Sequence, residues 1–194
     1  MKMKNYIRLL FISLCVSITT QYASADIDGK TALEWTLYYE ITINRPADEV
    51  WNDLINLDTW IITHHLERFS GEKNKKGEIW KVTPAGYLDI PESERPPRSF
   101  HFGESIRVEP GQHFLQKGFA PEGSYNGALE AIDFVDFRLK EKHGKTTITL
   151  NGVGVVKPTP TLSQVEADQM SQGSLGSMIV NLKNLKKIVE NRRR

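Results

Sequence analysis

The chain has 194 residues, and its 25 Lys and Arg against 24 Asp and Glu leave a formal net charge of +1 at pH 7. This near balance produces no strong electrostatic field, so no nucleic-acid partner is expected. Cys15 is the only cysteine, which excludes an intramolecular disulfide and a zinc site built from several cysteines.

The N-terminus has the pattern of a secretory signal peptide. Basic residues at positions 2, 4 and 8 precede an apolar stretch, residues 9–18, which is too short to span a bilayer. Ala23-Ser24-Ala25 then provides a small-x-small cleavage site. We therefore expect residues 1–25 to be removed, leaving a mature bacterial protein that starts at Asp26 and is periplasmic or secreted.

The alternative to cleavage is that the segment stays in place as an uncleaved N-terminal membrane anchor. Lipid attachment at Cys15 is not expected, because the residue before it is Leu14 rather than a small residue. After cleavage no stable membrane insertion is expected, and the mature chain is predicted to be a monomer.

The mature part opens with an alternating strand. From Trp35 to Ile43 apolar residues alternate with mostly polar ones, which is the period of a half-buried strand. Pro46 ends this strand and suits the first turn of a helix, where Asp48 and Glu49 complement the helix dipole. Apolar residues at helical spacing from Val50 to Leu57 predict that this helix is amphipathic.

A short second helix is predicted at residues 58–67, followed by a run of strands and a long terminal helix. Turn residues and period-two patterns predict strands at 78–83, 99–108, 113–119, 132–140 and 146–152, with a long loop at 84–98. Apolar residues on one face between Leu175 and Val189 predict the terminal helix within 162–190.

Several stretches resemble the START-like, or SRPBCC, superfamily, whose fold is also called the helix-grip fold. Residues 46–51 read Pro-Ala-Asp-Glu-Val-Trp, and further similar motifs lie at 108–112, 144–150 and 181–190. The pattern is closest to the polyketide-cyclase and heat-shock-activator-like branch. The resemblance implies one START-like domain over 26–194. Its class is α+β, with a curved antiparallel sheet wrapped around a long C-terminal helix and two short helices after the first strand.

The resemblance also implies a cavity between the sheet and the terminal helix that holds an apolar ligand, such as a lipid or an aromatic, polyketide-like compound. That branch often has Gly-Trp where this chain has Gly173-Ser174-Leu175-Gly176-Ser177, and this small-residue run would open room beneath the helix. Strand parity predicts that the cavity is lined by Trp80, Phe102, Ile106, Phe137, Leu150, Met178, Leu182 and Leu185. A filled core without room for a ligand is the alternative.

Polar candidates for chemistry are few. Glu104 is in phase with Phe102 and Ile106, so its carboxylate is predicted to point inward, where it would have to be paired, protonated or functional. The adjacent His64 and His65 would diverge on a helix and could not grip one metal ion together. No metal site and no cofactor are expected, and Asp133 receives no role.

We therefore predict an exported binding protein for an apolar small molecule rather than an enzyme. One alternative is a cyclase or dehydratase working in the same cavity, with Glu104, His64 or His65 as acid or base. Another is a protein-interaction module, which the likeness to chaperone activators would imply. No nucleophile elbow and no phosphate-binding loop is found in the sequence.

Overall fold

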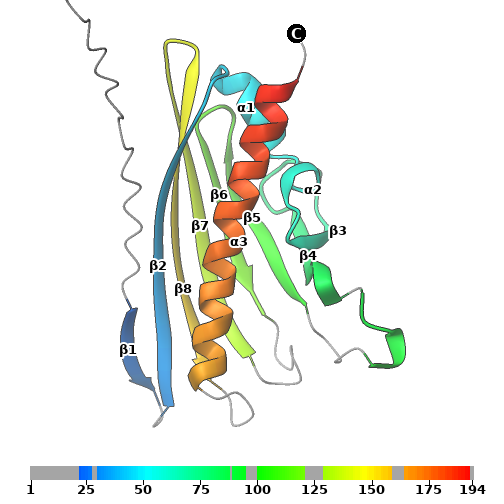
Figure 1. Ribbon diagram of the computed structural model, residues 1–194, viewed down its shortest axis with the longest axis vertical. Helices are drawn as coiled ribbons and strands as arrows, with labels where there is room; N and C mark the ends of the chain where they lie inside the picture. The colour runs from blue at the N-terminus through cyan, green and yellow to red at the C-terminus, as the bar shows by residue number, and fades with distance from the viewer. Residues whose placement is uncertain are drawn as a thin grey trace, which may run out of the picture.

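One curved antiparallel sheet wraps around one long helix in the computed structural model of the protein (Figure 1). The structure describes residues 22–27, 30–87, 89–94, 100–120, 129–158 and 164–192. Its strands are β1 (Tyr22–Ile27), β2 (Lys30–Ile43), β3 (His64–Ser70), β4 (Ile79–Pro84), β5 (His101–Glu109), β6 (His113–Phe119), β7 (Leu129–Lys142) and β8 (Lys145–Pro158). The helices are α1 (Ala47–Leu54), α2 (Leu57–Trp60) and α3 (Gln164–Asn191), with short 3-10 turns at Ala85–Tyr87 and Glu92–Glu94.

The strand order across the sheet is β1-β2-β8-β7-β6-β5-β4-β3, and every neighbouring pair is antiparallel. Strand β2 therefore bridges from the N-terminal hairpin to β8, while β3 to β8 follow one another as a meander. The predicted α+β helix-grip class is confirmed. In the described part of the chain, no helix is both long and apolar enough to cross a membrane.

The start of the fold follows the predicted alternation. The odd-numbered residues of β2 from Trp35 to Ile43 are buried, and the even-numbered ones between them are exposed. Pro46 directly precedes α1, and Asp48 and Glu49 lie in the first turn of that helix. A half-buried strand thus leads into a helix whose buried side faces the core.

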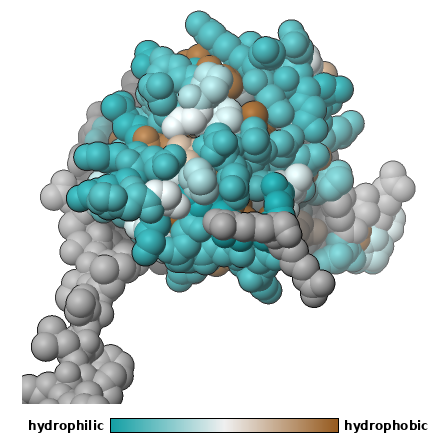
Figure 2. Space-filling model, turned by 90° about the horizontal axis from the view of Figure 1, so that it is seen from above, coloured by the Kyte–Doolittle hydropathy of each residue, from teal (hydrophilic) through white to brown (hydrophobic). Residues whose placement is uncertain are grey.

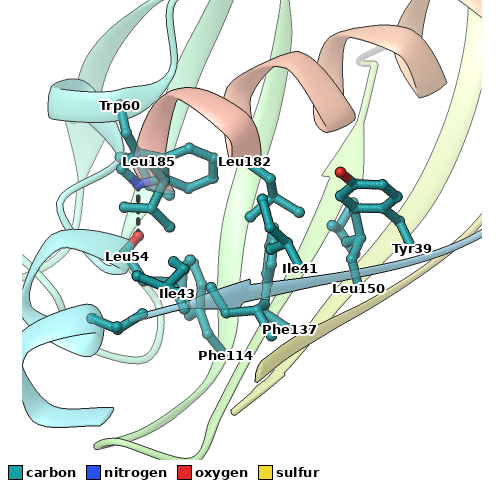
Figure 3. Close-up of a cluster of buried hydrophobic side chains, with 14 of the residues drawn as sticks. Tyr39, Ile41, Ile43, Leu54, Trp60, Phe114, Phe137, Leu150, Leu182 and Leu185 are labelled. Atoms are coloured by element: carbon teal, nitrogen blue, oxygen red, sulfur yellow. Dashed lines mark hydrogen bonds between the residues drawn. The ribbon is translucent and has the colours of Figure 1, made fainter. Parts of the chain in front are cut away.

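The core lies between the sheet and the C-terminal half of α3 (Figure 3). Leu182, Leu185 and Val189 of α3 are almost completely buried, as are Ile148 and Leu150 of β8. These side chains share one buried cluster with aromatic rings from α2, β6 and β7. Within that cluster, Trp60 and Phe137 form a T-shaped ring pair, and Phe114 and Phe137 form a stacked one. This apolar contact fixes α3 on the concave face of the sheet.

Polar contacts fix the same end of α3 in place. The carboxylate of Glu190 accepts both the main-chain N–H and the side-chain amide of Asn44, each at 2.8 Å. Arg45 donates to the carbonyl oxygens of Glu190 and Arg192 at 3.1 Å, and Arg192 pairs with Asp53 of α1.

Seen from above, the visible face of the molecule is mainly hydrophilic, with scattered hydrophobic residues (Figure 2).

The second helix is shorter than predicted, and the histidines lie on a strand. Helix α2 ends at Trp60, and Ile61 already has an extended backbone. The β-branched run from Ile61 to Thr63 disfavours helix continuation, and β3 begins at His64. The prediction of a helix over 58–67 is therefore wrong beyond Trp60.

The predicted cleavage site lies within β1, which pairs with β2. Removal of residues 1–25 would take away most of this strand and leave β2 at the edge of a seven-stranded sheet, β2 to β8. Cleavage itself stays a prediction.

Candidate functional site

Three glycines lie in one row of aligned residues that runs across the strands on the inner face of the sheet. The register aligns Trp35 with Gly154, Gly154 with Asp133, Asp133 with Gly118, Gly118 with Gly103, and Gly103 with Trp80. Opposed residues of neighbouring strands point to the same face. The buried Trp35 and Trp80 show that this is the inner face.

Asp133 stands near the centre of this row. Its carboxyl group lies directly over Gly118, so that a Cβ added to Gly118 would come within 2.3 Å of its Oδ1. The side chain is partly exposed, yet protein atoms surround it closely. Burial raises the pKa of Asp133 to about 6, against the opposing effect of a hydrogen bond from the Gly118 main chain.

Trp35 covers the β8 side of the row. Its indole lies on Gly154, whose added Cβ would meet the ring nitrogen at 2.4 Å, and it also reaches Gly152. Any larger residue at either glycine would displace the indole. The glycines of β8 are therefore needed for Trp35 to lie flat across the sheet next to Asp133.

The position above Gly103 is not filled by any side chain that the structure describes. A Cβ added there would meet only a methyl group of Val82, at 3.9 Å. Trp80 borders the position on β4, is 5% exposed, and its indole N–H has no partner among the described residues. Among the described side chains, none thus lies over the position between Trp80 and the carboxyl group of Asp133.

Two histidines lie beside this row. The rings of His64 and His101 are 5.9 Å apart in a T-shaped contact. Burial lowers the pKa of His64, and burial together with the neighbouring His64 lowers the pKa of His101 to about 4. Both imidazoles are therefore neutral near pH 7. Thr63 and His64 share a hydrogen bond of 2.9 Å between the Thr63 hydroxyl and the His64 Nδ1.

Most of the residues predicted to line the cavity lie on the inner side of the sheet or against it. Trp80, Phe137, Leu150, Leu182 and Leu185 are buried in the core, and Met178 packs against it from α3. They belong to one buried apolar cluster or pack against it, and the cluster includes the buried leucines of α3. Whether they touch a ligand stays a prediction.

The inward orientation predicted for Phe102 and Glu104 is wrong. Because Gly103 opposes the buried Trp80, its two neighbours must point to the outer face. Phe102 contacts Phe69, a residue that is 65% exposed, and Glu104 is paired in register with Lys117. Ile106 is half-buried at a register shift between Ser105 and Arg107, and it is not part of the core.

The histidines and the small-residue run also differ from expectation. On β3, His64 faces inward and His65 is exposed, so alternation along a strand, rather than a helical angle, separates them. No group of metal-binding side chains occurs among the residues that the structure describes. Gly176 is exposed, with no atom within 4 Å of an added Cβ, so at this position the run does not open space beneath α3. The side chains of residues 173–175 lie outside the described part.

Sequence reasoning missed Asp133 and His101. Asp133 is in phase with Val135 and Phe137, two inward residues of β7, and that phase could have identified it. His101 could have been found only through the register with Val82, because Phe100 and Phe102 dominate the local pattern.

Comparison with known proteins identifies the fold. The Zhui aromatase/cyclase from Streptomyces sp. R1128 matches with a TM-score of 0.61 at 13% identity, covering 83% of this chain and 96% of that one. The START-like, or helix-grip, fold is the fold of this chain. Ara h 8.0201 matches with a TM-score of 0.53 at 14% identity, over 82% of this chain and 99% of that one.

A truncated norcoclaurine synthase from Thalictrum flavum matches the same fold with a TM-score of 0.52, at 14% identity over 84% of this chain and 97% of that one. No protein-family model matches the chain, and neither does any curated protein. At these identities the similarity establishes the START-like fold, and the predicted resemblance is confirmed at that level.

Proposed function

We propose that the protein binds a small, largely apolar molecule between the inner face of the sheet and α3, next to Asp133. The observation that carries the proposal is the unfilled position above Gly103, bordered by Trp80 and Val82. Ligand sites in proteins combine apolar walls with a few placed polar groups, and this part of the sheet has both. The similar structures include an aromatase/cyclase and a norcoclaurine synthase, which is compatible with a small-molecule ligand.

The test uses the neutral fluorescent probe N-phenyl-1-naphthylamine. We expect the wild-type protein to bind it with increased fluorescence and to gain thermal stability by mass action. Gly103→Ile should fill the open position and weaken probe binding at least tenfold. Gly86→Ile is the matched control, because Gly86 is exposed on the turn after β4, outside the row, and an added Cβ there meets nothing within 4 Å. Unchanged probe binding by Gly103→Ile would contradict the proposed site.

A second candidate function is acid–base catalysis in the same place, as in a cyclase or dehydratase. It is favoured by Asp133, whose pKa of about 6 suits proton transfer near neutral pH. An enzyme would keep ligand affinity but lose turnover about 10²–10⁴-fold in Asp133→Asn. A protein that only binds the ligand would show no turnover, with or without this substitution.

Export is the other part of the proposal, and the signal-like pattern of residues 1–25 supports it. N-terminal sequencing of protein recovered from the periplasm or medium of a bacterial host should begin at Asp26. An intact Met1 in the recovered protein would refute this part alone.

A further inference from the structure

We propose that the ligand is a cation, an apolar molecule that carries a protonated amine, and that the carboxylate of Asp133 is its counter-ion. This inference rests on the proposed function, since it names the ligand class for the same site. It follows from three observations: the environment of Asp133, the charges around it, and the two tryptophans in its row.

Asp133 has no positively charged partner among the described residues. With the described residues its side chain makes one hydrogen bond, to the Gly118 main chain. A carboxylate held among protein atoms without a compensating charge is costly, because the protein replaces the water that would solvate it. A ligand cation placed beside the carboxylate would remove that cost.

Among the side chains that the structure describes, no basic group on the inner face of this region supplies the missing charge. His64 and His101 face the same side, but burial lowers the pKa of each, so both are neutral near pH 7. Arg68, which opposes Trp80, is exposed on the edge strand β3, four strands away from β7. Gln116, the inward residue of β6 next to Gly118, carries no charge.

Two connections at this end of the sheet and the first part of α3 carry no basic residue in the sequence, whereas the connection 85–100, from β4 to β5, carries Arg95 and Arg98 beside three acidic residues. The connections 121–128, from β6 to β7, and 159–163, from β8 to α3, contain Glu122 and no Lys, Arg or His. The first part of α3, residues 164–175, contains Glu166 and Asp168 and likewise no basic residue. Residues 121–128 and 159–175 therefore offer Asp133 no cation.

The tryptophans complete a cation site. Trp35 lies on Gly154, the residue opposite Asp133 on β8, and Trp80 lies at the other end of the row beyond Gly103. Indole faces attract cations through their quadrupole and also provide apolar surface. A carboxylate between two indoles thus favours an amine with an aromatic or alkyl body over a neutral or acidic analogue.

Three probes of similar size test the charge requirement: 3-phenylpropylamine, 3-phenyl-1-propanol and 3-phenylpropionate. We expect calorimetric titration of the exported protein at pH 7.5 to give at least tenfold tighter binding of the amine than of the alcohol, with the acid weakest. Asp133→Asn should abolish the preference for the amine and leave alcohol affinity within about twofold. Glu104→Gln is the control, since Glu104 is a carboxylate on the outer face of β5 and its removal should change nothing.

The pH dependence of probe binding provides a second test, on the wild-type protein. Amine binding should weaken several-fold between pH 7.5 and pH 5, because Asp133 takes up a proton as its pKa of about 6 is passed. Alcohol binding should stay constant over that range. The Asp133→Asn variant should lose this pH dependence.

The outcomes separate the two proposals. Equal binding of amine and alcohol, or an amine preference that survives in Asp133→Asn, would overturn the cation inference and leave the proposed function standing. Failure of all three probes and of N-phenyl-1-naphthylamine to bind would overturn both.

Discussion

Asn181 of α3 and Thr63, the residue before β3, are joined by two hydrogen bonds. The side-chain amide of Asn181 donates to the Thr63 hydroxyl at 2.8 Å, and its carbonyl oxygen accepts the Thr63 main-chain N–H at 3.3 Å. The same oxygen accepts the N–H of Ile62 at 3.0 Å. One buried amide therefore satisfies the backbone where the chain leaves α2 and enters the sheet.

The first prediction concerns this amide. Asn181→Leu keeps the approximate size of the side chain but leaves the two N–H groups without their acceptor, so we expect a loss of about 1–3 kcal/mol of unfolding free energy. Urea denaturation measures it. Lys183→Leu, at an exposed position of the same helix, is the control. A loss below about 0.5 kcal/mol for Asn181→Leu would show that the linkage contributes little.

The second prediction concerns packing of α3 on the sheet. Leu182 is 0% exposed, so Leu182→Ala should destabilise the protein by about 2–5 kcal/mol through lost burial and the cavity left behind. Val180→Ala serves as its neighbour control, because Val180 is 46% exposed. Similar effects of the two substitutions, measured by thermal or urea unfolding, would contradict the observed packing.

The third prediction tests the contact between Gly118 and Asp133. Gly118→Ala places a methyl group where the Asp133 carboxyl lies, so it should cost about 1–3 kcal/mol through overpacking. In an Asp133→Ala background the space is free, and the cost of Gly118→Ala should fall close to zero. A double-mutant cycle measures the difference. Additive effects would mean that the two residues do not touch.

The fourth prediction concerns acid stability. Burial lowers the pKa of His101 to about 4, so the folded protein holds a neutral imidazole that the unfolded chain protonates near pH 6.5. The contribution of the neutral ring is fully present above pH 6.5 and is lost as the pH falls through 4, by about 2–3 kcal/mol. His101→Phe should therefore lose less stability than wild type between pH 7 and pH 4.5. Parallel losses in urea unfolding at the two pH values would refute this role of His101.

The sequence predicts the fold well and the inner surface of the sheet poorly, and β2 and β5 show why. On β2 the buried residues are all large and apolar and their exposed neighbours are mostly polar, so the period alone identifies the inner face. On β5 the outward Phe102 is larger and more apolar than the inward His101 and Gly103, and only the register with Trp80 reveals the inner side. Hydrophobicity cannot orient a strand whose inner residues are small or polar.

Asp133 illustrates the same limit. A charged residue beside exposed Ile132 and Phe134 reads as a surface position, although those two apolar residues are the ones that point outward. Its inward placement depends on Gly118 and Gly154, which come from other strands and leave room for its carboxyl group. Such a site is created by cross-strand register, which a single sequence does not specify.

The polar anchors of α3 have a mechanical consequence. The hydrogen bonds and ion pairs described above join the helix to the rest of the fold through Asn181, Glu190 and Arg192, all in its C-terminal part or just beyond it. The arm from Asn181 back to Gln164 is about 25 Å long at 1.5 Å per residue. A tilt of about 10° around the fixed end would move the far end by about 4 Å. The two ends of α3 would therefore move by very different amounts, and the leucine-rich core, next to the fixed end, would stay packed.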